Sequence, residues 1–438
     1  MSALLSLEEA RERILAAVAG PLAAETVGLE EALGRVLAEP VRSTTDLPPW
    51  DNSAMDGYAI RAADVATASE AAPVRLAVIG EVAAGAAPEL VVTAGTAARI
   101  ATGALVPPGA DAVVPVELTT PLDPAGVAGP RGREATGSLP SACLVHEAVR
   151  TGSSIRRRGE DLGAGSIVLA AGSVISAAGV TIAAGSGVAA VRAHRRPRVG
   201  VLATGDEVRS PGEPLGPAGL PDANGPGLRA LVRTAGGEAV ALGVARDRLG
   251  DVVGRLRSAL DLVDALIVSG GVSVGPYDVV RGAFEAIGRV DLWRVAIQPG
   301  KPFAFGLAER AGQRPVLLFG LPGNPVSSFV TFELFVRPAL RRLAGHAQLI
   351  QPPDRAVLED QVTKSHGRRA FVRVAAVRGP TGGPLRDERG RVSVRLAGGQ
   401  GSHMLTALAA ADALAVIPEA HDTLPAGSEV ELWWLDRA

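Results

Sequence analysis

Short apolar runs alternate with helix-patterned segments between residue 198 and about residue 345. Short, mostly apolar runs, typical of buried strands, lie at 199–203, 239–244, 265–268, 294–297 and 316–319. The segments between them carry apolar residues at helical spacing, and Pro325 is expected to open a long helix to about residue 343. This alternation predicts a mostly parallel sheet with right-handed crossovers and helices on both faces.

The flanking segments have a different pattern. Residues 44 to about 165 contain short β-like runs broken by many glycines and prolines, and 121–140 is expected to be an exposed loop. From about residue 353 to the end, alternating runs predict a small antiparallel barrel or sandwich. At the other end, Ser6 followed by Glu9 fits a capping box that opens an amphipathic helix.

Composition narrows the class of protein. The 438 residues exceed what one hydrophobic core supports, so two to four domains are expected. Charged residues at 8–13 replace the apolar core of a secretory signal, and no apolar run free of charges and glycine clusters reaches the ~18 residues that span a bilayer. We therefore expect a soluble, cytoplasmic protein without a membrane partner. A net charge of -2 argues against bulk nucleic-acid binding, and the single Cys143 excludes an internal disulfide.

Four polar or glycine-rich loops follow the predicted strands. They are 204–207, 269–275, 299–302 and 321–325. In an open α/β sheet, ligands bind beyond the carboxyl ends of the strands, where glycines let backbone amides approach an anion. A phosphate-bearing ligand is therefore expected, although a single loop of this kind would equally fit an ordinary tight turn.

Carboxylates gather at the same predicted edge, namely Asp206, Glu207, Asp247 and Asp278. Mg2+ bridging phosphate oxygens needs one or two carboxylates plus water. The alternative is that Asp247 and Asp278 only cap helices, which is a common use of aspartate. Spacing alone does not separate the two interpretations, and both can hold together.

Lysine is rare in this chain, which has only Lys301 and Lys364. Lys301 lies between Pro-Gly and Pro, in one of the loops at the sheet edge. A compact ammonium meets an oxyanion differently from a planar guanidinium, which favours a binding role over chance. The segment 48–59 is a polar loop outside the α/β region, so it would reach this edge only by folding back or by dimerisation.

Seven motifs, in order and over essentially the whole chain, resemble the MoeA family, which includes the C-terminal domain of gephyrin. They are Asn52-Ser53-Ala54-Met55-Asp56-Gly57-Tyr58-Ala59, Thr102-Gly103-Ala104 with 107–113, Arg156-Arg157-Arg158-Gly159-Glu160-Asp161, Thr204-Gly205-Asp206-Glu207, 269–275 with Asp278, Pro299-Gly300-Lys301-Pro302, and Leu321-Pro322-Gly323-Asn324-Pro325. Each motif is modest alone, but their coincidence is highly specific.

The resemblance implies a multidomain α/β protein that forms an elongated homodimer. The expected units are an elongated linker domain (24–43 and 166–196), an inserted β-rich domain (44–165), a molybdopterin-binding α/β domain (4–23 and 197–345) and a C-terminal small β-barrel domain (346–438). It also implies insertion of molybdate into the dithiolene of adenylylated molybdopterin, with Mg2+-dependent release of AMP. The molybdopterin adenylyltransferase and molybdoenzyme acceptors are possible partners.

Site residues follow from the resemblance by motif. The functional carboxylates and hydroxyl correspond to Asp56, Thr102, Asp161, Glu207, Asp247 and Asp278, with Asp206, Glu207, Asp247 and Asp278 expected at the metal. The expected substrate-binding residues are Ser269, Gly270, Gly271, Ser273, Gly275, Pro299, Gly300, Lys301, Pro302, Arg369 (or its neighbour Arg368) and Ser402. We expect no side-chain nucleophile, because Cys143 lies outside every motif.

The chain departs from the family pattern at a few positions. Gln298 stands where many relatives carry lysine, so an oxyanion site here would have one cation fewer, and Asp412 stands where relatives often have asparagine. Two other functions remain open at this point. One is a molybdopterin adenylyltransferase, which the α/β region alone resembles, and the other is a non-enzymatic scaffold like gephyrin.

Overall fold

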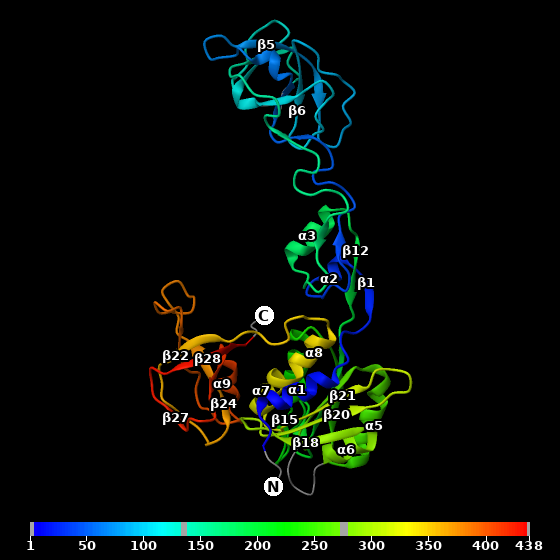
Figure 1. Cartoon of the computed structure of the whole chain (residues 1–438), viewed down its shortest axis with the longest axis vertical. Coiled ribbons are helices and arrows are strands. Elements are labelled where there is room, and N and C mark those ends of the chain that lie inside the picture. Colours follow the sequence, from blue (N-terminus) through cyan, green and yellow to red (C-terminus); the bar gives the residue numbers. More distant parts are fainter. Residues whose placement is uncertain (1–3, 133–137, 272–278, 436–438) are drawn as a thin grey trace.

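A computed structural model describes residues 4–132, 138–271 and 279–435. The molecule is elongated, with a β-rich unit at one end, a narrow middle, and two units side by side at the other end (Figure 1). This confirms the expected multidomain α/β architecture. In the described residues, no helix is long and apolar enough to cross a membrane.

The α/β domain is built on a six-stranded sheet. Its order is β16 (Glu238–Ala245), β13 (Arg198–Thr204), β17 (Ala265–Ser269), β21 (Val316–Leu321), β20 (Pro302–Ala308) and β18 (Arg289–Arg294). The first four strands are parallel, whereas β20 and β18 run antiparallel to their neighbours. The predicted 294–297 strand is therefore two pieces, since β18 ends at Arg294 and β19 (Ile297–Gln298) pairs elsewhere.

Helices cover both faces of this sheet. One face carries α1 (Leu7–Ala17), α4 (Asn224–Thr234), α7 (Pro325–Thr331) and α8 (Arg337–Leu343), and the other carries α5 (Leu249–Ala259) and α6 (Val279–Ile287). Side chains alternate along the central strands, so that Ile267 joins the first core while Leu266 and Val268 join the second. The helix predicted from Pro325 exists, but a π-helical turn (Phe332–Val336) separates α7 from α8.

The first helix confirms the predicted capping box. The Ser6 hydroxyl accepts the Glu9 N–H at 3.1 Å, and the Glu9 carboxylate accepts the Ser6 N–H at 2.9 Å. These bonds satisfy two backbone donors at the helix start. Leu7 and Ile14 of α1 are buried in the core of the α/β domain.

The β-rich end is one mixed six-stranded sheet with a short two-stranded antiparallel pairing beside it. Its order is β7 (Ala112–Pro115), β4 (Gly57–Ile60), β6 (Thr96–Ile100), β5 (Val74–Val82), β9 (Ala142–Val145) and β8 (Thr119–Leu122). Next to it, β3 (Asn52–Ser53) pairs with β10 (Ile155–Arg156). Short 3-10 helices lie at Ala62–Val65 and Val116–Leu118.

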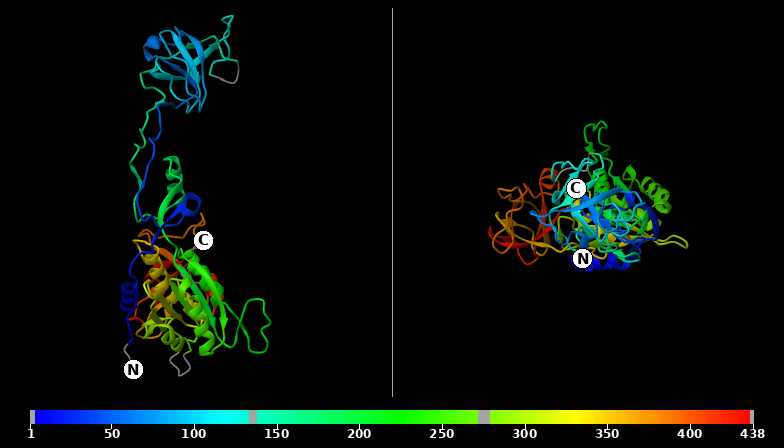
Figure 2. Two further views of the ribbon diagram at one scale, coloured as in Figure 1. Left: turned by 90° about the vertical axis from the view of Figure 1, so that its right-hand side faces the viewer. Right: turned by 90° about the horizontal axis from the view of Figure 1, so that it is seen from above.

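The narrow middle consists of two small ladders and two helices. Strand β1 (Ala24–Gly28) pairs with β12 (Ala190–His194), and β2 (Val41–Arg42) pairs with β11 (Ile167–Leu169). Helices α2 (Leu29–Ala32) and α3 (Ala177–Gly185) pack on these strands. Two extended chain segments then run to the β-rich end (Figure 2).

The C-terminal unit is a closed five-stranded barrel. Its strands are β22 (Asp354–Leu358), β24 (Arg369–Ala376), β25 (Val392–Leu396), β26 (Ala413–Ile417) and β28 (Glu429–Trp434), and the β24–β26 pairing closes it. The sequence left barrel and sandwich open, and it predicted antiparallel strands. The structure corrects the second point, because β22 and β25 are parallel. A short helix, α9 (Leu405–Ala409), and the pairing of β23 (Val362–Thr363) with β27 (Thr423–Leu424) complete the unit.

We propose to divide the chain at the boundaries expected from the sequence, and the four domain names are used in that sense below. Among the described residues, the named strands pair within one of these units, with β19 as the exception. Strand β19 belongs to the α/β domain by sequence but pairs in parallel with β24 of the barrel. This pairing joins the α/β domain to the C-terminal barrel domain.

Candidate functional site

Acidic side chains cluster where β13 and β16 end. Asp206 and Glu207 follow β13, and Asp247 follows the adjacent parallel strand β16. The Asp247 N–H donates to the Asp206 carboxylate at 3.4 Å. Helix α5 begins after Asp247 and has no side-chain cap. Asp247 therefore does not act as the helix cap that the sequence allowed. Asp278, the fourth predicted carboxylate, lies outside the described residues, as do Ser273 and Gly275.

The crowding of carboxylates has an electrostatic consequence. Partial desolvation of Asp247, together with the charges of Glu207 and Asp206, raises the pKa of this carboxyl above its ordinary value. A carboxylate surrounded by like charges gains from a nearby cation. The cluster is therefore suited to holding a positive ion or a cationic group.

Glycines let the loops at the ends of β13, β17 and β21 approach one another. Gly270 has a φ of +103°, and a Cβ there would lie 2.4 Å from the Thr204 carbonyl oxygen. A Cβ on Gly323 would lie 3.6 Å from the Gly270 Cα. Only glycine fits at Gly270, so the sequence Gly270-Gly271 is explained by close backbone packing as well as by ligand approach.

Ser269 is buried, and its hydroxyl is engaged inside the protein. It accepts the Asn224 amide at 2.7 Å and lies 3.3 Å from the Ser328 hydroxyl. Asn224 also donates to the Gly323 carbonyl at 2.7 Å. Asn224 is the first residue of α4, which has no side-chain cap, and its amide ties the β17 loop to the β21 loop. Ser269 therefore holds the loops together.

The Lys301 loop packs against α7. The Lys301 carbonyl accepts the Val295 N–H at 3.0 Å, and a Cβ on Gly300 would lie 2.6 Å from the Thr331 methyl group. Lys301 is half-buried, and no described residue forms an ion pair with its ammonium. Gln298 accepts the Ser365 N–H at 3.2 Å, which links this loop to the barrel.

Ser402 reaches the same place from the barrel. Its hydroxyl accepts the Asn324 amide at 3.1 Å, and its carbonyl accepts the Val326 N–H at 3.2 Å at the start of α7. The structure thus brings Ser402 to the helix that also supports the Lys301 loop. Arg369, in contrast, has two carboxylate partners, Glu8 and Glu419, and the second lies 3.1 Å from its Nε.

Arg373 was missed by sequence reasoning. It is fully buried, and its guanidinium donates to the carbonyls of Gly399 (2.9 Å) and Gly401 (3.2 Å), directly before Ser402. Among the described residues it has no carboxylate partner, and its Nε has no acceptor. The available signal was an arginine within the otherwise apolar run 370–374. A buried guanidinium without a counter-charge favours an anion nearby.

Asp56 and Thr102 meet in the inserted domain. The Asp56 carboxylate accepts the Thr102 N–H at 2.7 Å and the Thr102 hydroxyl at 2.9 Å. Asp161 lies where the inserted domain meets the linker, with its N–H bonded to the Leu47 carbonyl at 3.0 Å. Figure 1 shows this domain at the opposite end of the molecule from the α/β domain, which carries the acidic cluster. Within one chain, the two sets of predicted site residues are far apart.

The acidic cluster fits a magnesium site by its donor chemistry. Mg2+ binds through one or two carboxylates together with water and substrate phosphates. Asp206, Glu207 and Asp247 offer such oxygens on two neighbouring strand ends. Among the described residues, which do not include Asp278, no three acidic, histidine or cysteine side chains lie together as ligands for a metal ion. A site completed by substrate and water is the arrangement that fits.

Comparison with known proteins covers nearly the whole chain. Family models of the MoeA N-terminal region (domain I and II), a "probable molybdopterin binding domain" and the MoeA C-terminal region (domain IV) match residues 5–187, 200–342 and 355–435. A relative from Haemophilus influenzae named molybdopterin molybdenumtransferase is 34% identical over 98% of both chains. This chain belongs to the MoeA family.

Other MoeA-family relatives agree. Molybdopterin molybdenumtransferase 2 of Mycobacterium tuberculosis is 38% identical over 93% of this chain and 94% of its own. A solved molybdopterin biosynthesis MoeA protein from Pyrococcus horikoshii superposes with a TM-score of 0.75 at 32% identity, over 99% of both chains. The family resemblance expected from the seven motifs is confirmed.

We predict that Asp247→Asn changes how stability depends on pH. The raised pKa means that the folded protein keeps this proton longer than the unfolded chain. The contribution of Asp247 to the free energy of unfolding is therefore most favourable below the pKa that this residue has in the unfolded chain. It is lost as pH rises through the pKa that the residue has in the folded protein. The measurement is urea unfolding in the presence of a chelator from about pH 3 to about pH 7.

The free energy of unfolding of the wild type minus that of the variant should fall as pH rises. Asp387→Asn is the matched control, because the bond from Arg391 lowers the pKa of Asp387. For that pair the same difference should grow as pH rises. A difference for Asp247 that stays flat or grows would contradict the crowding of the acidic cluster.

Proposed function

We propose that this MoeA-family chain is a molybdopterin molybdenumtransferase. It would insert molybdate into the dithiolene of adenylylated molybdopterin and release AMP with Mg2+. The observation that carries the proposal is the meeting of two kinds of loop at one edge of the α/β domain. An acidic cluster suited to a metal-bound phosphate lies at the ends of β13 and β16. Around α7 lies a second group of loops, called the cationic seam below, which contains Gly300, Lys301 and Ser402.

The seam supports binding of an oxyanion dianion. Lys301 supplies an ammonium without an ion-pair partner among the described residues, and Arg373 supplies a buried positive charge behind the loop that carries Ser402. The Ser402 hydroxyl offers a hydrogen bond. Charge-assisted bonds of this type are stronger than neutral ones and suit molybdate. With glutamine at 298, the site relies on fewer cations than a relative with lysine there.

The acidic edge would act on the other half of the substrate. Mg2+, when bound, supplies charge neutralisation at the phosphate linkage that breaks when AMP leaves. Asp206, Glu207 and Asp247, with Asp278 expected from sequence, would hold the ion and orient the linkage. A covalent route through cysteine is disfavoured, since Cys143 is buried in the inserted domain and burial raises its pKa to about 12.

The proposal includes a homodimer with shared sites. Asp56 and Thr102 are bonded to each other and exposed, yet they lie at the far end of their own chain from the acidic cluster. A two-fold dimer would bring the inserted domain of one chain to the α/β domain of the other. The linker carries the exposed apolar side chains Leu33, Ile167 and Val174, which suit a subunit contact.

The function is tested with purified protein, adenylylated molybdopterin, molybdate and Mg2+. We expect AMP release and activation of an apo-molybdoenzyme that depend on both ions, and a loss of about a hundredfold or more in Asp278→Ala and Glu207→Gln. Asp387→Asn on the barrel surface is the control and should behave as wild type. Pyrophosphate release from molybdopterin and ATP would instead indicate an adenylyltransferase. A folded protein inactive in both assays would favour a scaffold.

Lys301→Ala is expected to weaken molybdate binding by about tenfold to a hundredfold, the loss for one charge-assisted hydrogen bond. Arg369→Met is the matched comparison: its guanidinium is already held by Glu8 and Glu419, so we expect a smaller effect. The measurement is molybdate titration at fixed pterin substrate. An equal loss of molybdate affinity in both variants would show that Arg369 also binds the oxyanion. An unchanged affinity in Lys301→Ala would show that Lys301 does not bind it.

Shared sites are tested by mixing two inactive chains, Asp56→Ala and Asp278→Ala. In a mixed dimer, one site collects both changes and the other collects neither. Random pairing makes half of the dimers mixed, so activity should recover to about a quarter of wild type. Two different tags isolate mixed dimers formed by co-expression. Isolated mixed dimers that stay as inactive as the parents would show that each chain builds its own site.

A further inference from the structure

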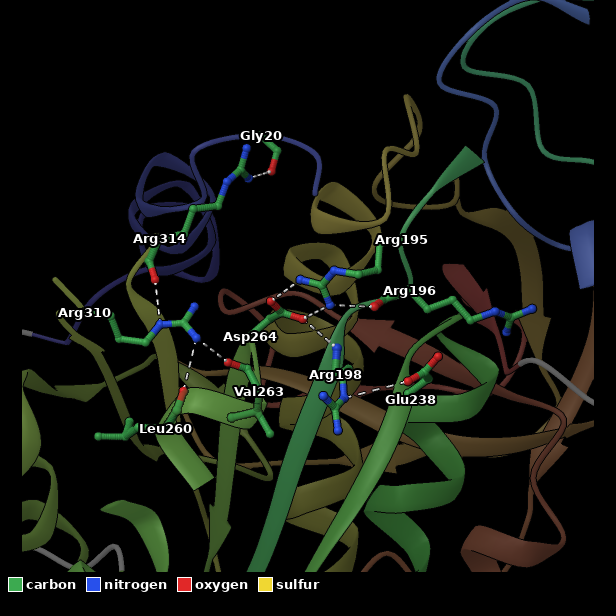
Figure 3. Close-up of polar contacts among 10 residues, drawn as sticks. All are labelled: Gly20, Arg195, Arg196, Arg198, Glu238, Leu260, Val263, Asp264, Arg310 and Arg314. Carbon is green, nitrogen blue, oxygen red and sulfur yellow. Dashed lines mark hydrogen bonds and ion pairs between the residues drawn. The ribbon is translucent and has the colours of Figure 1, made fainter. Parts of the chain in front are cut away.

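The linker joins the α/β domain through two chain crossings, near Gly20 to Ala23 and near His194 to Arg198. A network of arginine contacts surrounds both crossings (Figure 3). It lies at the amino ends of β13 and β17, whereas the acidic cluster follows the carboxyl ends of β13 and β16. Asp264, directly before β17, is at its centre and is buried, with 8% of its surface exposed.

Asp264 binds both the linker and the sheet. Its two carboxylate oxygens accept the Arg195 guanidinium at 2.7 and 2.9 Å, in a bidentate pair. One of these oxygens also accepts the Arg198 N–H at 2.8 Å, and the Asp264 N–H donates to the Arg198 carbonyl at 2.7 Å. A bidentate pair fixes direction as well as distance. Arg195 follows directly after β12, so its orientation determines how the linker leaves the sheet.

The crossing near Gly20 to Ala23 is held by the same network. The Arg195 N–H donates to the Ala23 carbonyl at 3.0 Å, and His194 Nδ1 lies 2.9 Å from the Leu22 carbonyl oxygen. Arg314 donates to the Gly20 carbonyl at 2.8 Å, and its own carbonyl accepts Arg310 at 2.9 Å. Arg310 then reaches the Leu260 carbonyl at 3.2 Å, in the segment that leads to Asp264. Both crossings are therefore tied to the start of β17.

Contacts at the other end of the linker are of a different kind. There, Asp46 pairs with Arg158 and Asp51 pairs with Arg157, and the two arginine side chains are 68% and 52% exposed. Exposed pairs are weak and are screened by salt. At the base, the Arg195 and Asp264 side chains are 36% and 9% exposed, so each is less exposed than its counterpart in the outer pairs and the pair is screened less.

We propose that the Arg195–Asp264 pair is a clamp that fixes the angle between the linker and the α/β domain. Its consequence for catalysis rests on the shared site proposed above. In that dimer the linker decides where Asp56 is presented, which makes Arg195 and Asp264 positioning residues. The cationic seam around α7 lies wholly within the α/β domain and the barrel. The clamp therefore does not contribute to the affinity for molybdate.

The clamp is tested by the distance between two spin labels, on Ala178→Cys in α3 of the linker and Ser258→Cys in α5. Both positions are exposed, and the buried Cys143 is replaced by alanine. In Arg195→Met we expect the distance distribution to broaden by roughly twofold, because the linker is released at its base. Where the shared site operates, kcat should fall while KM for molybdate stays unchanged.

Two further variants keep the test decisive if Arg195→Met folds poorly. Arg195→Met with Asp264→Asn leaves no unpaired buried charge, and the asparagine oxygen still accepts the Arg198 N–H, so this protein should fold with an equally broad distribution. Arg192→Met, on β12 in an exposed pair with Glu39, is the matched control and should keep the wild-type width. A wild-type width in the folded double variant would overturn the clamp. The label distances do not depend on turnover, so an inactive wild type would count against the proposed function alone.

Discussion

The pairing of β19 with β24 is the contact on which the candidate site depends. Two residues, Ile297 and Gln298, leave the α/β sheet and join the barrel, so the loop that carries Lys301 is shared between two domains. Helix α7 completes the seam. Its first turn donates a backbone hydrogen bond to Ser402 of the barrel, and its last turn packs against Gly300. The shared core supports this arrangement, because Phe371, Leu414 and Val416 of the barrel pack in the same hydrophobic cluster as the α/β domain.

Charge is distributed unevenly around that seam. Partial burial and the crowding of carboxylates at the ends of β13 and β16 raise the pKa of Asp247, while Arg373 is buried among backbone carbonyls. Each arrangement costs stability in the isolated chain, because like charges repel and a buried guanidinium loses its hydration. A substrate that brings a metal-bound phosphate and an oxyanion would relieve both. Strain of this kind at strand ends is expected of a binding site rather than of a structural edge.

The elongated shape adds a second constraint. Asp56 and Thr102 hold each other in place, but the linker separates them from the acidic cluster of the same chain. A site assembled across a dimer needs a linker that is stiff where it meets the α/β domain. The bidentate Arg195–Asp264 pair, whose carboxylate is buried, has the properties for this role, and the more exposed arginine pairs near the inserted domain do not.

Much of this protein can be predicted from its sequence, because the signals are local. Apolar periodicity predicts the central strands and helices, the capping box at Ser6 and Glu9 follows from side-chain reach, and seven motifs identify the family. The tertiary structure decided what depends on neighbours distant in sequence. It showed that Asn224 bonds Ser269, that β22 and β25 are parallel, and that Glu8 and Glu419 pair with Arg369 while Arg373 lies behind Ser402. A motif states which groups are present, but hydrogen bonds and desolvation are set by the groups that folding brings beside them, and these come from other parts of the chain.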